Sequence, residues 1–183
     1  MRQKYYLKLT YKNGRSGYNQ EFIYPECGEI AEPNADYNSN DPCGKGIHLA
    51  KTISGGLKYF SNPSEIRLAL VTGKIAGQDD CKIRVDKCHI LCLLPRLLYD
   101  DYDAEHKLLD DDYSAKCKPL YDDYNAKHKP LDDDHNAKRK LLDDDYNAKC
   151  KPLDDDYKAK HKLLDRKFMQ KAIRYYKKMV LLS

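Results

Sequence analysis

An eleven-residue repeat occupies residues 102–167 and limits what this part of the chain can fold into. Its units follow one another without a gap, and their first position is Tyr except at His135. The third position is always Ala and the eighth always Leu. Eleven residues make three turns at about 3.67 residues per turn, close to the period of an α-helix. Because no glycine follows Gly77, the repeat predicts helix rather than strands joined by tight turns.

The first, fifth and eighth positions of the repeat form one stripe along such a helix. A helix with so narrow an apolar stripe is unstable alone, so it must pack on the first domain, on itself or on another chain. The last Asp of a unit lies four residues before a Lys of the next unit, which favours helical ion pairs. The expected pairs are Asp134 with Lys138, Asp145 with Lys149, and Asp156 with Lys160.

Prolines hold the seventh position in three units, at Pro119, Pro130 and Pro152. A proline inside a helix removes one hydrogen bond and bends the axis. We therefore predict one long helix that these prolines kink. The competing interpretation is a chain of short helices, each beginning at a proline.

Charge divides the chain into three blocks, although the total is only +4. Residues 1–98 carry a net +4, residues 99–165 a net −6 and residues 166–183 a net +6. We expect an α+β fold with a small domain over 1–98, a helical repeat over 99–167 and a basic amphipathic helix end over 168–183. The ordinary explanation of this basic end is docking on the acidic repeat, and the alternative is a membrane surface or a nucleic acid.

The small domain shows short alternating segments with turn residues between them. Alternation and aromatic content predict strands over 5–11, 21–24, 66–71 and 82–94. A short helix is expected over 49–59, and residues 26–47 have the composition of loops.

The cysteines favour a reducing compartment. Their number, seven, is odd, and no apolar stretch follows the basic residues at the start, so we expect free thiols, no secretion signal and a cytoplasmic location. No apolar run approaches the roughly 18–20 residues that a membrane span needs.

The segment 43–48 is the one local candidate for a binding site. Gly44 and Gly46 allow a tight backbone path, while Cys43 and His48 place a thiol and an imidazole at its ends. An anion pocket, a Cys/His pair and half a zinc site are the functional interpretations. The ordinary one is a loop that enters a helix, with His48 bonded to the backbone. A zinc site needs four ligands, so the remaining ones would have to come from Cys27, Cys81, Cys88, His89 and Cys92. No two of these cysteines have the CxxC spacing that is common in zinc sites.

The repeat itself predicts no metal site. Its fifth position is Cys, His or Arg, but these side chains lie about 16.5 Å apart along one helix. The Asp-rich runs lack the glycine and closing Glu of a calcium loop.

A family resemblance covers about half of the chain. The segment Asp41-Pro42-Cys43-Gly44-Lys45-Gly46-Ile47-His48-Leu49, with residues 59–60, 67–75 and 80–85, resembles an uncharacterised small domain of bacteriophage and prophage proteins. Members of that family are often fused to glycine-rich β-solenoid repeats, whereas the repeat here is helical. The resemblance implies a phage origin and a host cytoplasm, with Cys43, Gly44, Gly46 and His48 as the positions that would bind a ligand.

These features favour a non-enzymatic phage-type accessory protein that interacts with other proteins. No motif of a known enzyme class occurs, so we assign no catalytic residue and no cofactor. The helical repeat would act as a spacer or self-association element. The alternative is a small ligand-binding or transferase-like enzyme that holds a phosphorylated ligand at Cys43–His48. Nucleic acid ranks lowest, because the acidic repeat repels phosphate.

Overall fold

The computed structural model describes residues 4–17, 21–37, 44–60, 62–128 and 136–182. The chain forms two units, of which the first joins Met1–Asp100 to Asp165–Ser183 and the second is Asp101–Leu164. An antiparallel sheet is followed by helices, which confirms the α+β prediction.

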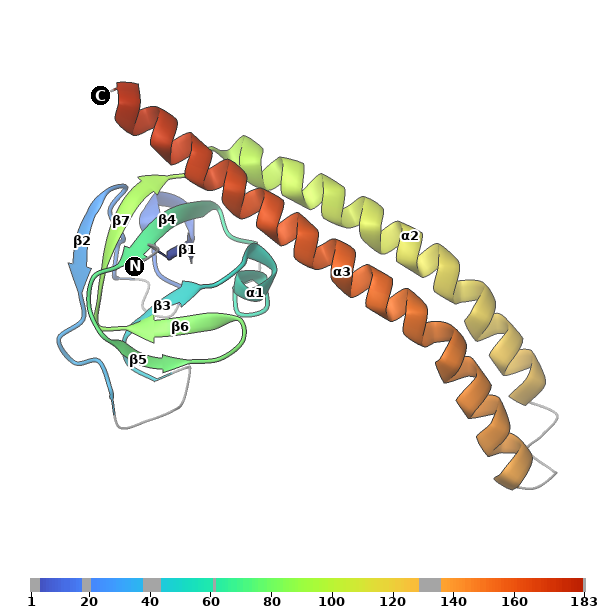
Figure 1. The fold of residues 1–183 in the computed structure, drawn as a ribbon. Helices are drawn as coiled ribbons and strands as arrows, with labels where there is room; N and C mark the ends of the chain where they lie inside the picture. Colours follow the sequence, from blue (N-terminus) through green and yellow to red (C-terminus); the bar gives the residue numbers. More distant parts are fainter. Residues whose placement is uncertain (1–3, 18–20, 38–43, 61, 129–135, 183) are drawn as a thin grey trace. The chain divides into compact units, whose positions relative to one another are not determined.

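A seven-stranded antiparallel sheet forms the body of the first unit, in the order β2-β7-β4-β1-β3-β6-β5. Figure 1 shows that this sheet is strongly curved. The strand bounds are β1 Tyr5–Thr10, β2 Gly28–Ala31, β3 Ile47–Ala50, β4 Glu65–Val71, β5 Ile75–Gln78, β6 Lys82–Val85 and β7 Lys87–Leu93.

A cluster of buried apolar residues covers one face of the sheet. The register pairs Ile47 with Val85 and Leu49 with Ile83 across β3 and β6, so these side chains share a face. Their cluster also contains Tyr6, Tyr24, Ile30, Ala69, Cys88 and Ile90. Cys88 and Cys92 of β7 are both buried, as expected for core thiols.

A short helix, α1 (Ile53–Leu57), follows β3. The Oγ1 of Thr52 caps it by accepting the amide N–H of Gly55 at 3.0 Å. At the same end, the amide and hydroxyl of Ser54 donate to Asp165, at 3.1 and 2.5 Å.

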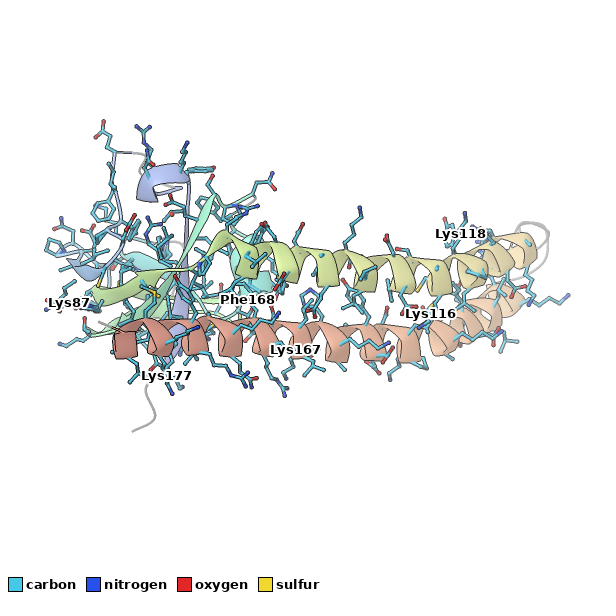
Figure 2. All side chains as sticks on the ribbon, turned by 90° about the horizontal axis from the view of Figure 1, so that it is seen from above. Lys87, Lys116, Lys118, Lys167, Phe168 and Lys177 are labelled. Atoms are coloured by element: carbon cyan, nitrogen blue, oxygen red, sulfur yellow. The ribbon has the colours of Figure 1, made fainter. Side chains whose placement is uncertain are left out.

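The end of the chain was expected to dock on the acidic repeat. Instead, Asp165–Ser183 belongs to the first unit, where Phe168 (labelled in Figure 2) is buried.

Several element predictions are confirmed and others are wrong. Strands β1 and β4 match the predictions for 5–11 and 66–71, while the predicted strand 82–94 is two strands that break at Asp86. Segment 21–24 forms only a single bridge, between Arg15 and Ile23. The predicted helix over 49–59 is wrong at its start, because β3 continues to Ala50. Strands β2 and β5 lie in segments expected to be loops, because each is too short to show alternation.

The repeat forms two helices, α2 (Arg96–His128) and α3 (Asn136–Leu182), instead of one. Within the second unit they run antiparallel. Tyr113 packs against Tyr157 and Tyr124 against Tyr146, with tilted rings whose centroids are 4.6 and 4.7 Å apart. The stripe therefore packs on itself, which is one of the three arrangements its narrowness allowed.

The helices continue through Pro119 and Pro152, so a chain of short helices is wrong at these two positions. Pro130 lies outside the described residues. Both prolines are exposed. The predicted ion pairs from Asp145 to Lys149 and from Asp156 to Lys160 are confirmed, each at 2.8 Å. Asp134 lies outside the described residues.

Candidate functional site

The glycines of the predicted loop make room for a buried arginine. Arg84 of β6 is fully buried, and its guanidinium donates to the carbonyls of Lys45 at 2.7 Å and Ala76 at 3.0 Å. A Cβ on Gly44 would lie 2.8 Å from Nη1 of Arg84, and one on Gly46 would lie 2.6 Å from its Cγ. Gly46 also has φ +146, a conformation that other residues rarely adopt. These glycines are thus explained by packing of the loop on Arg84.

His48 lies in strand β3, opposite Arg84, rather than in a loop before a helix. Its Nε2 lies 3.0 Å from the carbonyl oxygen of Gly44. Because a carbonyl only accepts, Nε2 carries the proton and Nδ1 keeps its lone pair. Burial, reinforced by the charges of Lys8 and Lys82, lowers the pKa of His48 to about 4. His48 is therefore neutral at pH 7. Cys43, its predicted partner, lies outside the described residues.

Lys8 is a buried cation beside this histidine. Its Nζ donates to the carbonyl oxygen of His48 at 3.2 Å and lies 4.2 Å from the ring centre of Tyr24. Only 8% of the residue is exposed, and burial lowers its pKa to about 8. Among the described residues, no carboxylate forms an ion pair with Lys8.

Lys82 supplies a second buried ammonium group. The residue is 6% exposed, and its Nζ lies 3.6 Å from the ring centre of Tyr59. The hydroxyl of Tyr59 in turn donates to Asp79 at 2.9 Å. Contact with an aromatic face stabilises a cation without neutralising its charge.

A cleft of about 870 Å³ borders all of these groups. This volume lies within the range of pockets that hold small organic ligands. Lys8, Lys82, His48, Gly44 and Gly46 all line it. The register places Lys8 on the same face of the sheet as Leu49, and His48 and Lys82 on the other face.

The aromatic rings that line the cleft are those of Tyr11, Phe22, Tyr24, Tyr59 and Phe60. The charged side chains of the lining are Lys8, Lys45, Lys82 and Glu32, so positive charge prevails. Together with the flat apolar rings, this charge suits an aromatic or sugar-bearing anion.

The described members of the cysteine and histidine set weighed for zinc form no metal site. No group of three or more potential ligands (His, Cys, Asp, Glu) that could hold a metal occurs within the described ranges. Burial raises the pKa values of Cys88 and Cys92 to about 11, so these thiols are poor nucleophiles. Cys27 is exposed and Cys81 is partly exposed.

Sequence reasoning missed both lysines. Lys8 lies within a predicted strand and Lys82 at the start of another, and neither residue was assigned a role from the sequence. The sequence of β1 offered no signal for the burial of Lys8, because Lys8 shares its face of the strand with Tyr6 and Thr10, as in an ordinary half-exposed strand.

None of the helices that the structure describes is long and apolar enough to cross a membrane. Comparison of the chain with models of protein families, with curated proteins and with solved structures finds no match. The resemblance to the phage domain family therefore stays a prediction from residues 41–93.

Proposed function

We propose that the first unit is a non-enzymatic binding module for a small phosphorylated ligand of nucleotide type, and that the helical repeat is its spacer. The observation that carries this proposal is Lys8, a buried ammonium group without a carboxylate partner among the described residues, on the wall of a large cleft. Burying a charge without a counter-ion is costly. A phosphate group in the cleft would supply that counter-ion and a charge-assisted hydrogen bond.

The aromatic lining of the cleft supports a ligand that carries a flat ring in addition to its phosphate group. Tyr59 and Phe60 line the cleft, and Lys82 lies over the ring of Tyr59. Tyr11 packs against Phe60 with tilted rings whose centroids are 4.6 Å apart. A base or another flat ring can stack on such side chains. The combination favours an organic phosphate over inorganic phosphate.

Binding is favoured over acid–base catalysis. A general acid or base works best with a pKa near the working pH, whereas the pKa of His48 is about 4. Its neutral Nδ1 suits it to accept a hydrogen bond from the ligand.

The repeat supports the spacer role, because its stripe is occupied by its own chain within the second unit. The charged faces of the helices remain for a protein partner. The resemblance to phage domains supports an accessory role in a phage or prophage.

Calorimetric titration of the full chain with AMP, inorganic phosphate and adenosine tests the proposal. AMP should bind most tightly and adenosine most weakly. Lys8→Met and Lys82→Met should each weaken AMP binding at least about tenfold, which corresponds to about 1.4 kcal/mol. Lys118→Met is the matched control, because Lys118 lies on α2 in the second unit (Figure 2) and should leave the affinity unchanged. Equal binding of AMP and adenosine, no AMP binding, or an unaffected Lys8→Met chain would overturn the proposal.

A further inference from the structure

The pairing of α2 with α3 repeats along the hairpin. One repeat forward in α2 is matched by one repeat backward in α3: this step takes the Tyr113–Tyr157 pair to the Tyr124–Tyr146 pair, and the centroid distance stays near 4.6 Å. The hydroxyl groups follow the same rule, because Tyr113 bonds Asp154 and Tyr124 bonds Asp143. We call each of these two tyrosine pairs a tyrosine layer. The register of α2 against α3 is therefore constant from one tyrosine layer to the other.

The same step applied to the fifth position brings two cysteines together. His106 and His161 hold this position in the first and last units, and their rings are in edge contact at 4.6 Å. One step along the hairpin replaces them with Cys117 and Cys150. These cysteines lie between the two tyrosine layers, where the register is constant.

The surroundings of the thiols agree with this placement. Both cysteines are free and partly exposed. Tyr146 of α3 interacts with Cys150 on its own helix and also with Cys117 of α2, and both interactions raise the pKa of Tyr146. The two thiols thus lie around one tyrosine.

We propose that Cys117 and Cys150 form a dithiol site that a small-molecule disulfide of the glutathione type converts into an intrachain disulfide between α2 and α3. The site lies in the second unit and is independent of the cleft.

The reaction proceeds by two thiol–disulfide exchanges. The thiolate of one cysteine attacks a sulfur of the small disulfide, which forms a mixed disulfide and releases one small thiol. The second cysteine, as thiolate, then attacks the protein sulfur of that mixed disulfide, so that the Cys117–Cys150 bond forms and a second small thiol leaves. The protein loses two protons and two electrons, and the oxidant takes them up as two thiols.

The product would join the helices near the middle of the hairpin. Opening of α2 from α3 would then require reduction of the bond, so the site would link the stability of the repeat to the redox state of its surroundings. Cys88 and Cys92 compete poorly for the oxidant, because they are buried and their pKa values are raised.

The test is peptide mapping of the full native chain after incubation with glutathione disulfide. Remaining thiols are alkylated, and cross-linked peptides are identified by mass spectrometry. We expect the Cys117–Cys150 peptide to be the main cross-link, in a yield that does not depend on protein concentration. Reduction should reverse it, and the cross-linked chain should show a higher helix melting temperature than the reduced chain.

A second chain keeps the test decisive. In Cys150→Ala/Arg139→Cys, the α3 thiol moves by one repeat, about 16.5 Å along the helix, but stays at the same kind of position. This chain should not form an intrachain cross-link with Cys117. The proposal is overturned if the wild type stops at separate glutathione adducts, if its cross-links join different molecules, or if the shifted chain cross-links as efficiently.

Discussion

Lys8 is the residue whose position is hardest to explain by stability alone. It occupies the interior of the central strand β1, where an apolar side chain would pack without any desolvation cost. Its pKa of about 8, against 10.5 for a solvated lysine, corresponds to about 3 kcal/mol of unfavourable burial. The bond to the carbonyl of His48 and the ring of Tyr24 recover part of this free energy. Such a locally unfavourable residue is expected where a ligand binds.

We predict that Lys8→Met stabilises the protein while it weakens ligand binding. At pH 7 the free energy of unfolding should rise by about 1–2 kcal/mol, because the loss of a hydrogen bond worth about 1 kcal/mol is smaller than the relief of burial. Urea denaturation at pH 7 and pH 10 measures this change.

The pH dependence identifies the cause. Between pH 8 and 10.5 native Lys8 loses its proton while the unfolded chain keeps it, so the wild type gains stability as pH rises. The advantage of Lys8→Met should therefore shrink at pH 10. A variant that is less stable than the wild type at pH 7 would show that Lys8 is a structural residue.

The two helices of the repeat depend on a shared register. In the Tyr–Asp bonds, the first position of a unit on one helix meets the ninth position of a unit on the other, as in Tyr157 with Asp110 at 2.5 Å. By this rule the first unit pairs with the sixth, the second with the fifth and the third with the fourth. Such a hairpin keeps its register only if it gains or loses one unit in each helix at the same time.

Deletion of repeats tests this rule. Removal of the second and fifth units together, residues 113–123 and 146–156, leaves both the His106–His161 and the Tyr124–Asp143 contacts in register. Removal of residues 113–123 alone shifts these two contacts by one repeat relative to each other, so they cannot form at once. Melting followed by far-ultraviolet circular dichroism should therefore show a higher midpoint for the doubly deleted chain, although it is one repeat shorter. An equal or higher midpoint for the single deletion would refute the pairing rule.

The helical period was predictable at this scale, but the reversal of the chain was not. The stripe of Tyr and Leu shows that the helix must pack against a partner. The stripe has the same sequence pattern whether that partner is another molecule or a second helix of the same chain. Only the contacts of residues such as Tyr113 with Tyr157 distinguish these cases. Prolines were a weak guide, because Pro119 and Pro152 lie on exposed positions where the helix tolerates them.

At the scale of the whole molecule, sequence analysis located one side of the cleft. Gly44, Gly46 and His48 do line the cleft. This segment could be found in the sequence because two closely spaced glycines indicate an unusual backbone conformation, whatever its function. Lys8 and Lys82 were missed, since their role arises from strands far apart in the sequence. Burial of a lysine is a property of the assembled sheet and has no local pattern.

The function proposed for the molecule rests on the charge of Lys8 inside the cleft. An anion that binds beside this ammonium group must stabilise its protonated form, so the pKa of Lys8 must rise. The most direct measurement is therefore the NMR titration of the Lys8 side chain with and without saturating AMP. We predict that the pKa of Lys8 moves from about 8 toward 10.5 when AMP is present. A pKa that is the same with and without AMP would contradict the account.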